Sequence, residues 1–105
     1  MLKVVKSPLA KTDIKKIWRY THGKWGEQQA DAYLYNLGHA IESIADSPKI
    51  GVNIEYVRQG YRMYHHQCHL IIYRFTPVAI EIVRVLGEKM DISRHLYPNL
   101  CFITQ

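Results

Sequence analysis

The fold is decided by residues 61–96, which read YRMYHHQCHLIIYRFTPVAIEIVRVLGEKMDISRHL. The links between the apolar runs of this stretch contain only two or three residues, whereas a parallel crossover needs about a dozen or more. The sequence therefore predicts three consecutive antiparallel strands. The runs are rich in β-branched and aromatic residues and have the length of strands: 61–65, 68–75 and 79–86.

Each predicted strand contains one arginine: Arg62, Arg74 and Arg84. Arginine is rarely buried on the covered face of a sheet, so we expect at least one face of this sheet to be exposed to solvent. A planar guanidinium binds phosphate through two hydrogen bonds and stays charged at any physiological pH. These arginines therefore suit a phosphate clamp, but composition alone favours surface salt bridges with Glu55 and Glu81.

The first residues of the chain predict a strand followed by a helix. The short apolar run Leu2–Val5 has strand character and stops before Ser7. Ser7 followed by Pro8 predicts a helix start, because the hydroxyl accepts a hydrogen bond from an unpaired amide and proline has no amide to leave unpaired. Apolar residues recur on one face of this helix, which we expect to end near residues 22–23.

The cations of this first predicted helix lie mostly away from its apolar face. A row of this kind can be an interaction surface, but a solvated lysine face is the commoner explanation. The row contains Lys11, Lys15, Lys16 and Arg19.

A second amphipathic helix is predicted from Gly26 to about Asp46, where Ser47 and Pro48 end it. Residues 48–59 show no clear period and are predicted to be a connecting loop. Two helices joined by a short link form an antiparallel hairpin, and its apolar face needs a sheet to cover.

The predicted fold class is α+β, with two layers and the order β-α-α-β-β-β. An antiparallel helical hairpin packs on a twisted sheet that contains the three-stranded meander, and the first strand lies beside the last. A short C-terminal helix is expected at 92–96, after Asp91. Residues 1–96 are predicted to be a single domain and residues 97–105 a tail.

Composition indicates one globular domain. The chain has 105 residues, of which 48% are hydrophobic and 22% charged. It contains 14 Lys+Arg against 9 Asp+Glu, which favours an acidic partner as much as it favours plain solubility. The sequence shows neither an apolar run of membrane-spanning length nor a secretory signal, so we expect a cytoplasmic protein that does not insert in membranes.

Chemistry-bearing motifs are sparse. His65 and His69 are four residues apart but straddle a predicted turn and not a helix, and the two cysteines do not form a CxxC motif, so no metal site is expected. Cys68 and His69 are neighbours on a predicted strand and should point to opposite faces. Gly-rich phosphate loops are also absent, and we expect neither a small-molecule cofactor nor catalytic residues.

Several segments along residues 1–96 together resemble the RelE/ParE toxin superfamily, and most closely its ParE branch. The resemblance is a distributed pattern over the predicted helices and strands. It is carried by residues 5–10, 13–14, 17–18, 41–48, 61–63, 69–74, 80–86 and 90–96.

The resemblance implies the toxin component of a bacterial type II toxin–antitoxin system of the plasmid-stabilisation kind. ParE-like toxins inhibit DNA gyrase and are neutralised by a ParD-like antitoxin, whose acidic, disordered C-terminal segment folds along the toxin. Such a segment offsets part of its ordering cost with apolar burial and charge pairs. Nucleic acid is then expected to be contacted only indirectly, through gyrase or the antitoxin complex.

Two alternatives remain. The RelE branch cleaves messenger RNA on the ribosome, using basic residues and a late Tyr or His as acid/base group. Arg62 and Arg84 match such basic positions, but neither Tyr nor His directly follows Arg84, and Gly87 stands where ParE relatives often carry His. The third hypothesis is a non-toxic protein that only binds the antitoxin and assists assembly.

The resemblance also suggests where the partners bind. The expected contacts with gyrase are Arg62, Arg74, Arg84, Met90, Asp91, Arg94 and His95. The expected contacts with the antitoxin are Arg58, Arg62, Tyr64, Tyr73, Arg74 and Arg84.

Overall fold

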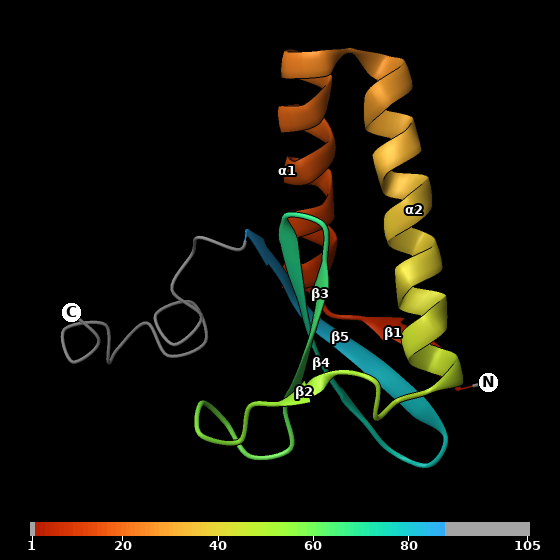
Figure 1. The fold of residues 1–105 in the computed structure, drawn as a ribbon, viewed down its shortest axis with the longest axis vertical. Helices are drawn as coiled ribbons and strands as arrows, with labels where there is room; N and C mark the ends of the chain where they lie inside the picture. Colours follow the sequence, from red (N-terminus) through yellow and green to blue (C-terminus); the bar gives the residue numbers. More distant parts are fainter. Residues whose placement is uncertain (1, 88–105) are drawn as a thin grey trace, which may run out of the picture.

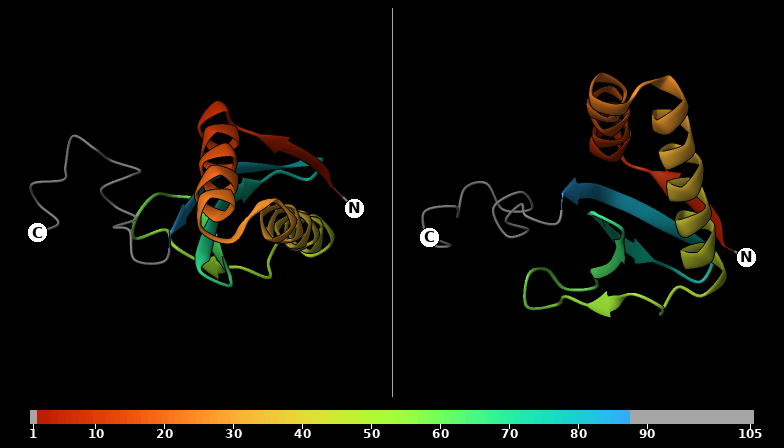
Figure 2. Two further views of the ribbon diagram at one scale, coloured as in Figure 1. Left: turned by 90° about the horizontal axis from the view of Figure 1, so that it is seen from above. Right: turned by 45° about the horizontal axis from the view of Figure 1, so that its top comes forward.

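A computed structural model describes residues 2–87, which form a sheet with two helices on one face (Figures 1 and 2). This arrangement confirms the predicted two-layer α+β fold. The helix predicted at 92–96 and the tail at 97–105 lie outside the described residues. The elements are β1 (Lys3–Lys6), α1 (Pro8–Trp25), α2 (Glu27–Asp46), β2 (Val52–Asn53), β3 (Arg62–His66), β4 (His69–Phe75) and β5 (Ala79–Gly87).

The five strands lie in the order β1-β5-β4-β3-β2. Strands β3, β4 and β5 form the predicted antiparallel meander. Strand β1 pairs in parallel with β5, so the first strand lies beside the last, as predicted. The short strand β2 pairs with β3 and arises within the segment predicted to be a loop.

Ser7 joins the start of α1 to the sheet. Its Oγ accepts a hydrogen bond from the Ala10 amide at 3.0 Å, as an N-cap does, and donates one to the Val83 carbonyl at 2.7 Å. The Ser7 amide also donates to the Ile82 carbonyl at 3.0 Å. The predicted helix start is therefore confirmed, and the same residue fixes α1 against β5.

The helical hairpin has a tighter turn than predicted. Helix α1 continues through Gly23 to Trp25, and Gly26 alone separates it from α2. Gly26 has a φ of 94°, in the region that favours glycine, and its amide donates to the His22 carbonyl at 2.9 Å. The helix ends at this glycine because only there does the backbone take a left-handed conformation. Neither helix of the described residues is long and apolar enough to span a membrane.

The main core lies between the hairpin and the sheet. Helix residues such as Ile17, Leu37 and Ile44 pack against the sheet residues Ile71 and Ile82, and all five are buried. Burial of this apolar surface is the main force that holds the two layers together. The helices therefore cover one whole face of the meander.

A second, smaller core lies on the other side of the sheet, which we call the far face. Ile54 and Val57 from the segment between β2 and β3 cover Ile72 and Leu86 there, and Figure 2 shows this segment on the side opposite the helices. The expectation of a solvent-exposed face is therefore correct only for the part of the far face that this segment leaves open.

Tyr73 occupies the main core and is fully buried, so the expectation that it contacts an antitoxin is wrong. Its hydroxyl donates to the Pro48 carbonyl at 2.6 Å and accepts from the Gly51 amide at 2.9 Å. A Cβ on Gly51 would lie 2.6 Å from that hydroxyl, so only glycine fits there. Burial raises the pKa of Tyr73.

We predict that Tyr73→Phe destabilises the fold by about 1–3 kcal/mol, because the buried Gly51 amide loses its acceptor. Urea unfolding at pH 7.5 measures the change. Tyr56→Phe is the matched control, since Tyr56 is 82% exposed. Equal unfolding midpoints for the two variants would contradict the assigned role.

The raised pKa of Tyr73 adds a pH dependence to the same comparison. Its contribution is fully present below the tyrosine pKa of the unfolded chain, about 10, and is lost as pH rises through the higher folded-state pKa. The stability difference between the wild type and Tyr73→Phe should therefore shrink above pH 10.

Candidate functional site

The structure separates the three strand arginines that the sequence groups together. Arg84 forms an ion pair with Asp13 of α1, in which Nε lies 2.7 Å from Oδ2 and Nη2 lies 3.0 Å from Oδ1. The two side chains are only 15% and 9% exposed. The expectation that Arg84 lies on an exposed face and pairs with a surface glutamate is therefore wrong.

A register shift in the sheet lies next to Arg84. Arg84 pairs with Ile72 but Ile82 pairs with Tyr73, so Val83 has no residue opposite it. The extra residue breaks the alternation of side chains along β5, which periodicity alone cannot reveal. The hydrogen bond to Asp13 raises the pKa of Arg84.

Asp13 is the centre of this interaction, and sequence reasoning gave it no role. Besides Arg84 it accepts the Val85 amide at 3.0 Å, so one carboxylate holds a side chain and a backbone group of β5. A signal was present, because position 13 lies on the apolar face of the helix, three residues after Ala10 and four before Ile17. A carboxylate on such a face indicates a buried partner.

The open part of the far face carries two exposed arginines, Arg58 and Arg74. The guanidinium carbons of Arg58 and Arg74 lie 5.6 and 5.9 Å from the centre of the Tyr61 ring, close enough for cation–π attraction. Arg74 Nε also lies 2.6 Å from Glu81 Oε1, which confirms the predicted salt bridge and raises the pKa of Arg74. We call Arg58, Tyr61, Arg74 and Glu81 the arginine cluster.

The remaining predicted contact residues do not join this cluster. Arg62 donates from Nε to the Gly51 carbonyl at 3.2 Å and from Nη2 to the Lys49 carbonyl at 3.3 Å, so it ties down the segment before β2. Tyr64 packs against the main core on the helical side. Both are half-buried. Met90, Asp91, Arg94 and His95 lie outside the described residues.

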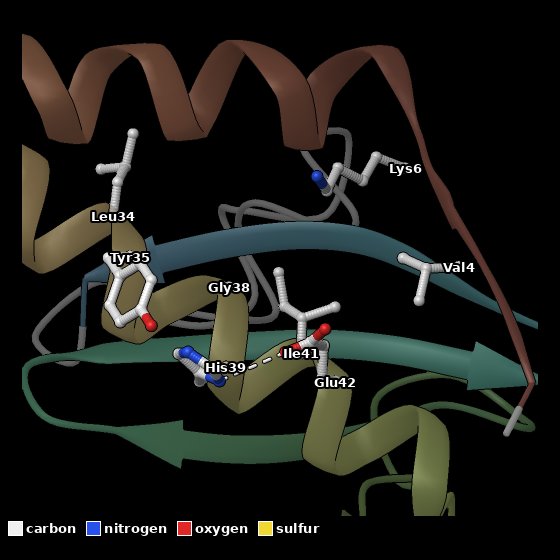
Figure 3. A pocket seen from close by; sticks show the side chains of 8 residues that line it. All are labelled: Val4, Lys6, Leu34, Tyr35, Gly38, His39, Ile41 and Glu42. Carbon is white, nitrogen blue, oxygen red and sulfur yellow. Dashed lines mark ion pairs between the residues drawn. The ribbon is translucent and has the colours of Figure 1, made fainter.

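A groove of about 500 Å³ lies between β1 and α2 (Figure 3). Val4 from the strand and Leu34 and Ile41 from the helix give it apolar walls. His39 and Glu42 form an ion pair of 3.2 Å at its rim. Strand β1 is an edge strand with β5 as its sole neighbour among the described strands, so its outer edge borders the groove.

A cluster of polar side chains lies at the turn between β3 and β4. Cys68 belongs to this turn and not to a strand, and its Sγ lies 3.5 Å from His69 Nδ1, so the expectation that the two side chains point apart is wrong. His69 Nδ1 lies 2.5 Å from the Tyr33 hydroxyl. Burial lowers the pKa of His66 on the same hairpin. Within residues 2–87 we find no group of three or more potential metal ligands.

The sequence of this chain is similar to those of known proteins over most of its length. The sequence model of the ParE toxin of type II toxin–antitoxin system, parDE, matches residues 4–92. Toxin ParE1 of Mycobacterium tuberculosis (strain H37Rv) is 41% identical over 91 residues, which is 86% of this chain and 93% of that protein. Toxin ParE1 of Caulobacter vibrioides is 40% identical over 87 residues, covering 83% of this chain and 90% of that protein.

The fold is also similar to a solved structure. The chromosomal ParDE TA system from P. aeruginosa contains a chain that superposes with a TM-score of 0.72 at 15% identity. The superposition covers 83% of this chain and 96% of that one. At this identity the similarity supports the arrangement of helices and strands.

We predict that Asp13→Asn destabilises the protein by about 3–5 kcal/mol, because the largely buried charge of Arg84 loses its carboxylate. The double variant Asp13→Asn/Arg84→Met should recover most of the loss, since the amide oxygen of Asn still accepts from Val85. Urea unfolding at pH 7.5 gives the free energies of unfolding.

Asp46→Asn is the control, since Asp46 is exposed at the end of α2 and the change should stay within about 0.5 kcal/mol. A loss below about 1 kcal/mol for Asp13→Asn would show that the buried ion pair does not hold α1 on the sheet.

Proposed function

The chain belongs to the family of ParE toxins of type II toxin–antitoxin systems, and from this membership we propose that it inhibits DNA gyrase and is neutralised by a ParD-like antitoxin. The family model and the ParE1 relatives each span most of the chain. The proposed site of action is the bacterial cytoplasm, where gyrase and its DNA are found.

The environment of Arg84 is the observation that favours gyrase inhibition over messenger-RNA cleavage. A phosphate clamp needs a guanidinium that is free to meet charge developing in the transition state. Arg84 instead satisfies a buried carboxylate, and the residues that follow it, Val85 and Leu86, are buried and apolar. A RelE-like ribonuclease would have to break the interaction that joins α1 to β5.

We propose that the antitoxin binds around the edge of the sheet formed by β1. Val5 on this strand is exposed and lies beside Glu81. On the far face Glu81 pairs with Arg74, and Arg74 and Arg58 both lie at the Tyr61 ring. Val4, the preceding residue, faces the apolar groove on the helical side.

A single acidic and apolar segment that passes around β1 would therefore meet both surfaces. Its carboxylates would contact the arginine cluster and its apolar residues would fill the groove, as is typical of segments that fold on binding. Because its outer edge is open, β1 also offers main-chain groups to such a segment.

Gyrase inhibition is tested with the purified chain in a supercoiling assay. We expect inhibition at micromolar concentration, accumulation of cleaved DNA, and relief by the antitoxin encoded next to the gene. Cleavage of messenger RNA in a translation extract with undisturbed gyrase would instead favour the ribonuclease. Failure of induced expression to arrest growth without the antitoxin would favour the non-toxic assembly protein.

The antitoxin surface is tested with Arg58→Ala/Arg74→Ala. We expect the affinity for the antitoxin to fall about tenfold or more, because arginines stacked on an aromatic ring are typical energetic centres of an interface. Isothermal titration calorimetry measures the change. Lys24→Ala/Lys49→Ala removes the same charge from exposed positions outside the cluster and should leave affinity within about threefold; an equal loss in both would rule out the proposed surface.

A further inference from the structure

The charges of the two helices are segregated by sign. Helix α1 contains five Lys and Arg against one acidic residue, Asp13, which Arg84 neutralises. Helix α2 contains four acidic residues and neither Lys nor Arg. The two helices lie side by side in one hairpin (Figure 1), so the hairpin has one cationic and one anionic member.

Four of the five cations of α1 lie close together on its exposed side. They are Lys11, Lys15, Lys16 and Arg19, which we call the cation row. Lys11, Lys15 and Arg19 follow at intervals of four residues, so they line one side of the helix over about 12 Å. Thr12, also exposed, lies beside them. The row is therefore a straight, uninterrupted strip of positive charge.

The cation row has no counter-ions among the described residues. None of its four side chains takes part in an ion pair within residues 2–87, although the neighbouring helix contains four carboxylates. Like charges at i, i+4 destabilise a helix. The helix N-terminus adds further positive potential, since its first turn contains no acidic residue. The arrangement opposes helix stability and attracts polyanions.

We propose that the cation row binds the phosphate backbone of duplex DNA. Duplex DNA carries one negative charge per about 1.7 Å of its axis and binds cations without apolar contacts. The anionic helix α2 orients the chain, because it is repelled by the same DNA that attracts α1.

The composition of the row argues against an acidic protein or a single strand as its partner. A protein interface needs a buried apolar centre, whereas the exposed apolar side chains of α1 do not form one, since Leu9 precedes the cation row and Tyr20 and Trp25 follow Arg19. Single-stranded nucleic acid needs aromatic rings on which successive bases stack, whereas the exposed rings of α1, Tyr20 and Trp25, both follow Arg19 and do not alternate with the cations. A rigid strip of cations suits a rigid duplex.

This inference goes beyond the proposed function, since it assigns direct DNA contact to the chain itself. It does not require gyrase to be the target. The test therefore uses the purified full chain, with neither gyrase nor antitoxin, so that failure of one proposal does not decide the other.

The test measures binding to a fluorescein-labelled 20-base-pair duplex by fluorescence anisotropy between 50 and 200 mM salt. Lys11→Gln/Lys15→Gln/Arg19→Gln should weaken binding at 50 mM salt tenfold or more. It should also reduce the slope of log K against log salt by about 2.7, because each lost phosphate contact removes about 0.9. Circular dichroism checks that the helices remain.

Lys3→Gln/Lys6→Gln/Lys49→Gln is the matched control, since it removes the same charge from exposed positions outside α1. This variant should bind DNA with an affinity within about threefold of the wild type, and its slope of log K against log salt should differ from the wild-type slope by less than about one unit. Equal losses in the two triple variants would show that net charge alone drives binding and would overturn the proposal. Failure of the wild type to bind at 50 mM salt, or tighter binding to a single-stranded RNA of the same length, would also overturn it. The proposal would also be overturned if Lys11→Gln/Lys15→Gln/Arg19→Gln lost binding to polyglutamate but kept its binding to DNA.

Discussion

The carboxylate of Asp13 fixes the position of α1 relative to the sheet, which the apolar core alone would not define. Apolar contacts are non-directional and tolerate small displacements of a helix over a sheet. A bidentate bond to Arg84 and a third bond to the Val85 amide accept only one position of α1 on β5. Ser7 adds a second fixed point, because it caps the helix and bonds the same strand.

This attachment decides which surfaces are available for binding. With α1 held over β5, a groove on the helical side lies between α2 and the edge strand β1. On the far face the segment between β2 and β3 covers one end of the sheet and leaves Arg58 and Arg74 exposed around Tyr61. The surfaces proposed for the antitoxin therefore meet at β1, whereas the cation row lies apart on α1.

Burial assigns different roles to chemically identical side chains. Arg84 is a structural counter-ion, Arg62 binds backbone carbonyls, and Arg74 is paired at the surface. A surface pair such as that of Arg74 contributes at most about 1 kcal/mol, and can exchange its carboxylate for that of a partner at little cost. The buried pair cannot do so, because removing either member leaves an uncompensated charge.

The sequence by itself determined the order of the helices and of every strand except β2, the antiparallel meander, the helix start at Ser7 and the membership of the toxin family, because these depend on local periodicity, turn residues and a distributed pattern. Only the tertiary structure decided that Tyr73 and Arg84 are buried. The environment of Arg84 depends on a partner 71 residues away in the chain. The turn at Gly26 and the approach of Cys68 to His69 also depend on the backbone conformation of single residues, which hydrophobic periodicity does not encode.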